Sequence, residues 1–337
     1  MSRSVFFLAT TLLAILGAPA SRAEDGRAAA IVERFRDANA WRGHVMVAAH
    51  RGGWMEGGEI RLAENSLSSL QRAIDLGVEI VEADIQRTRD GEFVILHDET
   101  LDRTTTCKGE VAQQTLAQLG DCRLVVEGTG AITGEGVPTL RAFLEAAKGR
   151  IMVNLDSKLG VESLAAMTAM ARELGMSEQI VAKAYVDKPE QFEAARAVLS
   201  AMGPQGQFMP QLSDAVSSDL EPMRRAALDL RPQAMELRNT HEAGQPLTPD
   251  GGLFFAMPAR ALAVRHDVHL WINTLYDDKT NGLRSGGRGD EMAIRAGLPG
   301  EVYGFWAEHG ATLIQTDEPK AAIEWLAAHG YRIPYRE

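Results

Sequence analysis

The feature of this sequence that most restricts its fold is a series of short apolar runs, each followed by residues capable of acid–base or metal chemistry. Residues 45–49, 80–83 and 93–96 form three such runs. The residues at their ends are His50 and Arg51, Glu82 and Asp84, and His97 and Asp98. An apolar run of this length suits a buried parallel strand, and the ligands of α/β folds collect at the carboxyl ends of such strands. We therefore expect two histidines and a carboxylate pair to meet at one mouth of the fold.

These residue types suit metal-assisted acid–base chemistry. Glu82 and Asp84 are two positions apart, so on a strand their side chains face the same side. Two close carboxylates repel each other unless a cation lies between them, and hard oxygen ligands favour Mg²⁺ or Ca²⁺. His50 and His97 titrate near neutral pH and can exchange protons with a substrate. A structural ion-pair network, in which Arg51 neutralises one of the carboxylates, is the alternative that the spacing leaves open.

Nine motifs follow one another along the chain. They are His50-Arg51-Gly52, Glu64-Asn65-Ser66, Glu82-Ala83-Asp84, Thr88-Arg89-Asp90-Gly91, His97-Asp98, Leu101-Asp102-Arg103-Thr104-Thr105, Asp156-Ser157-Lys158, Trp271-Ile272-Asn273, and Thr316-Asp317 followed by Pro319. Each motif alone is weak, but the first six stand in the order and at the spacing of one family. The sequence from about residue 45 to residue 319 thus resembles the glycerophosphodiester phosphodiesterase family.

The resemblance implies an α/β fold, a (β/α)₈ TIM barrel, with the active site at the C-terminal ends of its strands. It implies hydrolysis of a small-molecule glycerophosphodiester to an alcohol and glycerol 3-phosphate. By the same resemblance His50 and His97 are the catalytic pair, one acting as base and the other protonating the leaving alkoxide. A cyclic phosphate formed by a glycerol hydroxyl is one route. The residues expected to bind the substrate or its phosphate are Arg51, Lys158, Trp271 and Asn273.

The resemblance also implies one divalent metal ion, Ca²⁺ or Mg²⁺. Its expected ligands are Glu82, Asp84 and Asp156, with Glu64 close by. Asp156 stands where the family has a glutamate, which is one methylene longer. Sphingomyelinase-D-like barrels look to use aspartate at this position, so the ligand role survives while the substrate class becomes open.

Two other functions are compatible with these residues. A lysophospholipid or sphingolipid head-group phosphodiesterase on the same barrel is favoured by Asp156 and Lys158. Such an enzyme would be expected to have an apolar loop at the mouth of the barrel. Residues 277–290, which follow the strand expected at 269–273, are Gly-rich and charged instead. They can form a substrate lid that uses Lys279, Arg284 or Arg288, or a solvated insertion. A non-catalytic periplasmic binding protein would not need two histidines beside three carboxylates.

The net charge of −11 argues against a nucleic-acid partner, because no Lys/Arg-rich stripe is present to neutralise phosphates. Residues 1–23 are typical of a secretory signal, with Arg3 before an apolar run over residues 5–16 and a small-x-small cleavage site. That run is too short to span a bilayer. We expect a periplasmic or secreted protein without stable membrane insertion, whose single barrel domain covers residues 24–337.

Cys107 and Cys122 are the only cysteines. In an oxidising compartment they are expected to form a disulfide, which closes a loop of about 15 residues and contributes roughly 3 kcal/mol. Two buried free thiols are the alternative. The bond would fix a loop beside the expected active site.

The apolar runs give nine candidate strands for eight places in a barrel. They are residues 45–49, 80–83, 93–96, 151–155, 180–185, 208–212, 234–237, 269–273 and 312–315. Residues 208–212 contain Pro210 and are the weakest candidate. The connection over residues 86–92 is too short for a helical crossover, so the helix usual between two barrel strands is missing there.

Overall fold

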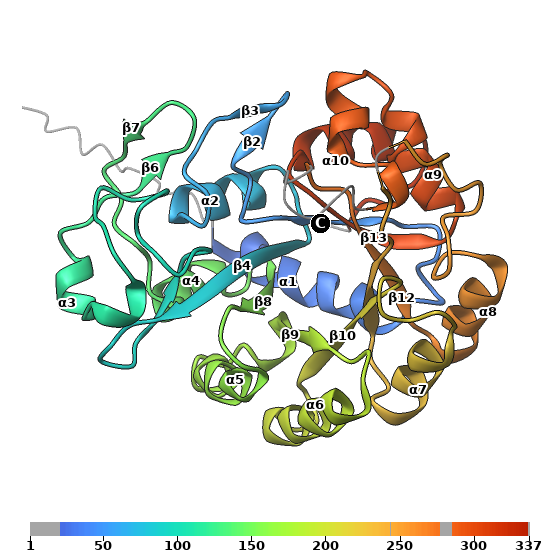
Figure 1. Cartoon of the computed structure of the whole chain (residues 1–337), viewed down its shortest axis with the longest axis horizontal. Coiled ribbons are helices and arrows are strands. Elements are labelled where there is room, and N and C mark those ends of the chain that lie inside the picture. Colours follow the sequence, from blue (N-terminus) through green and yellow to red (C-terminus); the bar gives the residue numbers. More distant parts are fainter. Residues whose placement is uncertain (1–20, 243, 277–284, 336–337) are drawn as a thin grey trace, which may run out of the picture.

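Eight parallel strands form a closed barrel in the computed structural model, which describes residues 21–242, 244–276 and 285–335 (Figure 1). In order around the barrel they are β1 (Met46–Ala49), β4 (Ile80–Arg87), β8 (Met152–Ser157), β9 (Ile180–Tyr185), β10 (Gln207–Ser213), β11 (Ala234–Arg238), β12 (His269–Asn273) and β13 (Ala311–Thr316). β1 pairs with both β4 and β13, which closes the ring. The predicted (β/α)₈ barrel is confirmed.

Helices surround the ring of strands (Figure 1). They are α2 (Leu67–Asp75), α4 (Leu140–Ala147), α5 (Leu164–Glu173), α6 (Pro189–Met202), α7 (Glu221–Asp229), α8 (Met257–His266), α9 (Tyr303–Glu308) and α10 (Pro319–Ala328). In α2 the hydroxyl of Ser66 accepts from the Ser69 backbone N–H and forms a capping box, which stabilises the start of the helix. No helix of the described residues is long and apolar enough to cross a membrane.

Side chains inside the barrel lie in layers, because alternate residues of each strand point inward. The lowest layer is apolar and consists of Met46, Ile80, Met152, Val181, Met209, Ala234, Trp271 and Leu313. The helix α1 (Ser21–Arg36) closes this end, with Ile31, Val32 and Phe35 packed against the layer. The next inward residues towards the C-terminal ends of the strands are polar. Because α1 closes the base, these polar groups face the open end of the barrel at the C-terminal ends of the strands.

Two assignments of barrel strands were wrong: one expected barrel strand lies outside the barrel, and the candidate considered weakest lies in it. Residues 93–96 do not give a barrel strand: β5 (Phe93–Ile95) pairs antiparallel with the outer end of β4, with Ile85 opposite Ile95. The connection is too short for a crossover, so the chain turns back as a hairpin at Gly91, which has φ +93°. Residues 208–212 instead lie in the barrel strand β10. Pro210 is tolerated because the ladder to β11 begins only at Gln211.

An insertion between β5 and α4 stands beside the mouth of the barrel. It contains α3 (Leu116–Leu119) and the small hairpin of β6 (Val125–Val126) and β7 (Ala131–Ile132). Cys107 and Cys122 are bonded within it, with a Cα–Cα distance of 5.4 Å, as predicted. A second small hairpin, β2 (Met55–Glu56) with β3 (Glu59–Ile60), follows the end of β1.

Candidate active site

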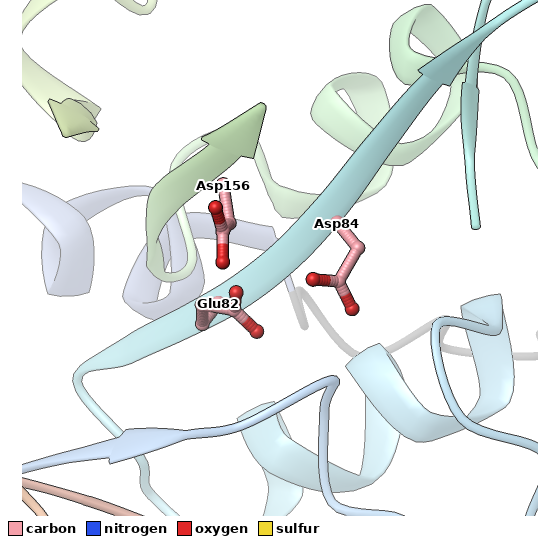
Figure 2. A group of neighbouring side chains, drawn as sticks. All are labelled: Glu82, Asp84 and Asp156. Carbon is pink, nitrogen blue, oxygen red and sulfur yellow. The ribbon is translucent and has the colours of Figure 1, made fainter. Parts of the chain in front are cut away.

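Three carboxylates converge at the C-terminal ends of two neighbouring strands. Glu82 and Asp84 point inward from β4, and Asp156 points inward from β8, where it lies opposite Asp84 (Figure 2). Each residue offers a carboxylate oxygen, and these oxygens all lie within 4.8 Å of one another. The parallel register therefore unites residues that are 72 positions apart in the chain (156 − 84).

Basic side chains surround this cluster. Lys158 Nζ lies 2.8 Å from Asp84 Oδ1 and 3.1 Å from Asp156 Oδ2. Lys183 Nζ, from β9, lies 3.5 Å from Asp156 Oδ2 and 3.7 Å from Glu82 Oε1. Arg51 Nε lies 3.3 Å from Asp84 Oδ2. The ion-pair network considered from the sequence is therefore present, and it includes one lysine that no motif indicated.

The pKa values of the carboxyl groups show that the basic side chains neutralise some of these carboxylates more than others. Burial and the nearby Asp84 raise the pKa of Glu82 well above its usual value. Burial acts in the same direction on Asp84, but Lys158 and Arg51 prevail and lower its pKa. Glu82 Oε1 is buried and has no hydrogen-bond partner among the described residues. A divalent cation prefers such oxygen ligands and would relieve this repulsion, so the three carboxylates fit a metal site.

His50 stands at the end of β1 in a constrained turn. Its Nδ1 lies 2.7 Å from Asp317 Oδ1. Burial lowers the pKa of His50, and the negative charge of Asp317 only partly opposes this. The following residue, Arg51, has a left-handed φ of +54°, unusual for a non-glycine residue and common at functional sites. At Gly52, with φ +88°, an added Cβ would collide with Ser69. The turn thus needs glycine in order to present His50 and Arg51.

His97 reaches the same mouth by the β4–β5 hairpin. The hairpin returns the chain to the level of Asp84, whose carbonyl oxygen accepts from the Leu96 N–H at 3.0 Å. His97 Nδ1 lies 2.8 Å from Asp98 Oδ1. Asp98 in turn contacts Arg103 Nε at 2.8 Å. His97 is therefore held from the insertion side of the mouth, and His50 from the barrel side.

Glu64, predicted to lie close to the metal ligands, is not part of the carboxylate cluster but shares Arg51 with Asp84. Its oxygens lie 3.0 Å from Arg51 Nη1 and 2.7 Å from Arg103 Nη2. The two guanidinium groups thus occupy both oxygens, and these interactions outweigh burial and lower the pKa of Glu64. Glu64 joins Arg51 to the Arg103–Asp98–His97 chain of contacts.

Two cavities meet at the histidines. A polar cavity of about 240 Å³ lies over the carboxylate cluster, and a larger one of about 730 Å³ lies beside it. Both are lined by His50, Arg51, His97 and Leu275. The polar cavity is also lined by Lys158, Lys183, Gln211, Glu236, Asn273 and Gln315. A ligand that occupies both cavities would therefore pass between the two histidines.

Three of the four predicted substrate residues, Arg51, Lys158 and Asn273, line the polar cavity. Trp271 does not, because it lies two residues lower on β12, in the apolar layer, and is fully buried. Its indole Nε1 donates to Asn273 Oδ1 at 2.8 Å, and Asn273 Nδ2 donates to Glu236 Oε1. Trp271 therefore orients Asn273 rather than contacting a ligand in this cavity.

The predicted lid falls largely outside the described residues. Lys279 and Arg284 belong to the undescribed segment 277–284. Arg288 is described and lines neither cavity. It is buried, lies 3.2 Å from Glu301 and stacks over the Phe305 ring at 3.8 Å. An arginine engaged in this way is not available to a substrate.

Four residues of the site could not be assigned a role from the sequence. Asp317 and Arg103 lie in recognised motifs, but their partners His50 and Asp98 become visible only in the fold. Lys183 and Glu236 lie in no motif; they come from β9 and β11, on either side of β10, and lie 3.3 Å apart. Each is a charged residue in an otherwise apolar strand run, and that signal would have identified both.

The fold defines a class, the TIM barrels. Solved structures with similar folds include a glycerophosphoryl diester phosphodiesterase from Parabacteroides distasonis, with a TM-score of 0.62 and 19% identity over 91% of this chain and 93% of that one. Another is a putative glycerophosphoryl diester phosphodiesterase from Silicibacter pomeroyi, with a TM-score of 0.61 and 17% identity over 90% and 99% of the two chains. At these identities the likeness concerns the fold alone.

Sequence comparison gives the family. The profile of the glycerophosphoryl diester phosphodiesterase family matches residues 50–204, and that of a domain of unknown function matches residues 251–326. A glycerophosphodiester phosphodiesterase of Caldanaerobacter subterraneus subsp. tengcongensis is 34% identical over 118 residues, 35% of this chain and 46% of that protein. A probable glycerophosphodiester phosphodiesterase 1 of Mycobacterium tuberculosis is 43% identical over 77 residues, 23% of this chain and 26% of that protein. The matches span less than half the length of these relatives. The predicted resemblance is confirmed, and residues 50–204 match the model of this family.

Proposed function

We propose that this protein is a metal-dependent phosphoric diester hydrolase that converts glycerophosphodiesters into an alcohol and glycerol 3-phosphate. The observation that carries the proposal is the meeting of His50, His97 and Arg51 at one cavity, directly above three clustered carboxylates. A structure of an Oleispira antarctica phosphodiesterase with a similar fold, 19% identical, contains the product sn-glycerol-3-phosphate, which supports the substrate class.

The phosphate group is placed by charge. Arg51 and Lys158 line the polar cavity and supply positive groups for the phosphoryl oxygens. Glu82, Asp84 and Asp156 would hold one Ca²⁺ or Mg²⁺ ion, which supplies further stabilisation of negative charge when bound. The glycerol hydroxyls face the polar floor formed by Lys183, Gln211 and Glu236.

The two histidines divide the proton transfers. With its Nδ1–H donating to Asp317, His50 keeps an unprotonated Nε2, and its lowered pKa keeps the ring neutral at neutral pH. His50 is therefore the base that accepts the proton of the attacking group, either a water molecule or a glycerol hydroxyl whose cyclic phosphate water then opens. His97, whose Nδ1 lies against Asp98, is the acid that protonates the leaving alkoxide. Such transfers contribute about 10²–10⁴ in rate.

A substrate panel with and without chelator tests this function. The purified protein is incubated with glycerophosphoethanolamine, glycerophosphocholine and a lysophosphatidylcholine, and glycerol 3-phosphate is measured enzymatically. We expect glycerol 3-phosphate from the first two, loss of activity in EDTA, and recovery with Mg²⁺ or Ca²⁺. Release of choline from the lysolipid alone would contradict the proposed substrate, and full activity in EDTA would contradict the metal requirement.

A further inference from the structure

The larger cavity beside the histidines is lined by apolar and aromatic side chains together with charged side chains. We propose that it binds the leaving alcohol and selects phosphodiesters whose alcohol is neutral and has an apolar body of several carbons. This inference rests on the proposed hydrolysis and names its substrate class more closely. It is carried by the position of the cavity, by its walls, and by the pairing of the charges that line it.

The position follows from the two-cavity arrangement. The polar cavity offers cations for the phosphate and hydrogen-bonding groups for a glycerol. The larger cavity begins at the same histidines, and at about 730 Å³ it has room for a substituent much larger than the glycerol. With glycerol phosphate in the first cavity, the oxygen that leaves lies at His97 and the rest of the alcohol extends into the second.

The walls of the larger cavity are largely hydrocarbon and aromatic. Trp54, Met55 and Ile60 come from the hairpin after β1, and Leu275 and Tyr276 follow β12. Trp54 and Met55 are each only 7% exposed, so the hairpin turns these side chains inward instead of towards solvent. The apolar surface expected from a lysolipid-type loop at the mouth is thus present, but it belongs to this hairpin and not to residues 277–290.

The charged residues of the same cavity already have partners. Arg103 Nη1 lies 2.6 Å from Glu127 and its Nη2 lies 2.9 Å from Asp98. Arg295 lies 3.0 Å from Glu291, and its guanidinium lies over the Tyr276 ring. A cationic or anionic alcohol would have to break such a pair to gain a counter-ion among the described lining residues. A neutral alcohol does not incur that cost.

The hairpin wall is held in place before any ligand binds. The carboxylate of Glu318 accepts from the backbone N–H groups of Gly57 at 2.8 Å and Gly58 at 2.6 Å, and from the Tyr276 hydroxyl at 2.9 Å. Glu56 of the same hairpin pairs with Lys320 at 2.6 Å. A preformed apolar wall gains the burial of an alkyl chain without the cost of ordering a loop.

The experiment compares alcohols of equal chemical reactivity. Glycerophosphoethanol and glycerophosphohexanol both release a primary alkoxide, so a difference in kcat/KM reports binding of the extra four methylenes. We expect kcat/KM to be at least about tenfold higher for the hexyl compound. Partial burial of the four extra methylenes is enough to give an effect of this size. We expect glycerophosphoethanolamine, which carries a positive charge, to give no advantage over the ethyl compound.

Variants place the effect in the hairpin. Ile60→Ser should lower the hexyl-to-ethyl ratio of kcat/KM at least about threefold. Because the ratio is measured within one preparation, a loss of folded protein does not change it. Ile132→Ser is the matched control, since Ile132 is 67% exposed on β7 and lines neither cavity. It should leave the ratio unchanged.

The outcomes separate this inference from the function on which it rests. A hexyl-to-ethyl ratio near one, a preference for the charged ethanolamine compound, or an equal effect of the Ile60 and Ile132 variants would overturn the apolar alcohol site. In those cases continued hydrolysis of glycerophosphoethanol would leave the proposed function standing. Failure to hydrolyse any glycerophosphodiester would overturn both.

Discussion

At the scale of single residues, the site is a set of buried charges that neutralise one another only in part. Lys183 lies within 3.7 Å of Glu82, Asp156 and Glu236, yet the pKa of Glu82 remains raised. The carboxylates themselves were predicted from spacing and resemblance, because two acids two apart on a strand must share a face. Their lysine and glutamate neighbours come from strands far along the chain, and only the closed barrel brings them together.

Removing one carboxylate tests the metal site. Asp156→Asn keeps the shape of the side chain but deletes one negative ligand, while Lys158 and Lys183 remain as opposing cations. We expect the affinity for Mg²⁺ or Ca²⁺ to fall at least about tenfold, as measured by calorimetric titration, and activity to recover in part at high metal concentration. Glu173→Gln, on the exposed face of α5, is the control. Unchanged metal affinity in Asp156→Asn would show that the cluster does not bind the ion.

At the scale of elements, the sequence predicted the strands but not which of them close the barrel. The apolar runs that give β5 and β10 look alike, and proline made the true barrel strand the weaker candidate. What decides between them is connection length, since residues 86–92 allow only a hairpin whereas α6 precedes β10. The wrong assignment left the site intact, because the hairpin still returns His97 to the mouth.

The base of the barrel is fixed by one buried glutamate, and this gives a prediction about pH. Glu79 Oε2 accepts from the Val47 N–H at 2.9 Å, and Glu79 Oε1 lies 2.7 Å from Arg332 of the C-terminal segment. Burial alone would raise the pKa of Glu79, but Arg332 and His44 prevail and hold it at about 2. A carboxyl group with a lowered pKa stabilises the fold above its unfolded pKa, near 4.5 for glutamate, and loses this effect as pH falls towards 2.

We therefore expect Glu79→Gln to lower the free energy of unfolding at pH 7 by about 3 kcal/mol. The difference between wild type and variant should shrink as pH falls from about 4.5 towards 2. Urea denaturation across this range measures it, with Glu33→Gln on the exposed face of α1 as the control. A difference independent of pH would mean that the lost interaction is not ionic.

At the scale of the whole molecule, the first helix is the base of the barrel. The packing residues Ala28, Ile31, Val32 and Phe35 are all buried beneath the strands. They lie after the proposed signal-peptide cleavage near Ala23, so export would leave the base of the fold intact. The packing of α1 on the barrel base has no signature in the sequence, because it depends on eight separate strands.

This gives a prediction about the mature protein. When the full chain is expressed with export to the periplasm, we expect N-terminal sequencing of the soluble product to begin near Glu24. A chain that starts at Glu24 should unfold at the same temperature as that product. Retention of residues 1–23 in the exported protein, or a large loss of thermal stability on their removal, would contradict the proposed localisation and processing.

The central claim is that His50 and His97 act as one acid–base pair on a glycerophosphodiester, and the most direct measurement is kcat for both single variants and the double variant. We expect His50→Asn and His97→Asn each to lower kcat about 10²–10⁴-fold with metal affinity retained, and the double variant to cost little more. The kcat of the wild-type protein should show a bell-shaped dependence on pH. Because burial lowers the pKa of His50 below 6.5, the rate should fall on the acid side only below that pH, as His50 becomes protonated. Near-normal turnover by His97→Asn on every glycerophosphodiester tested would contradict the account.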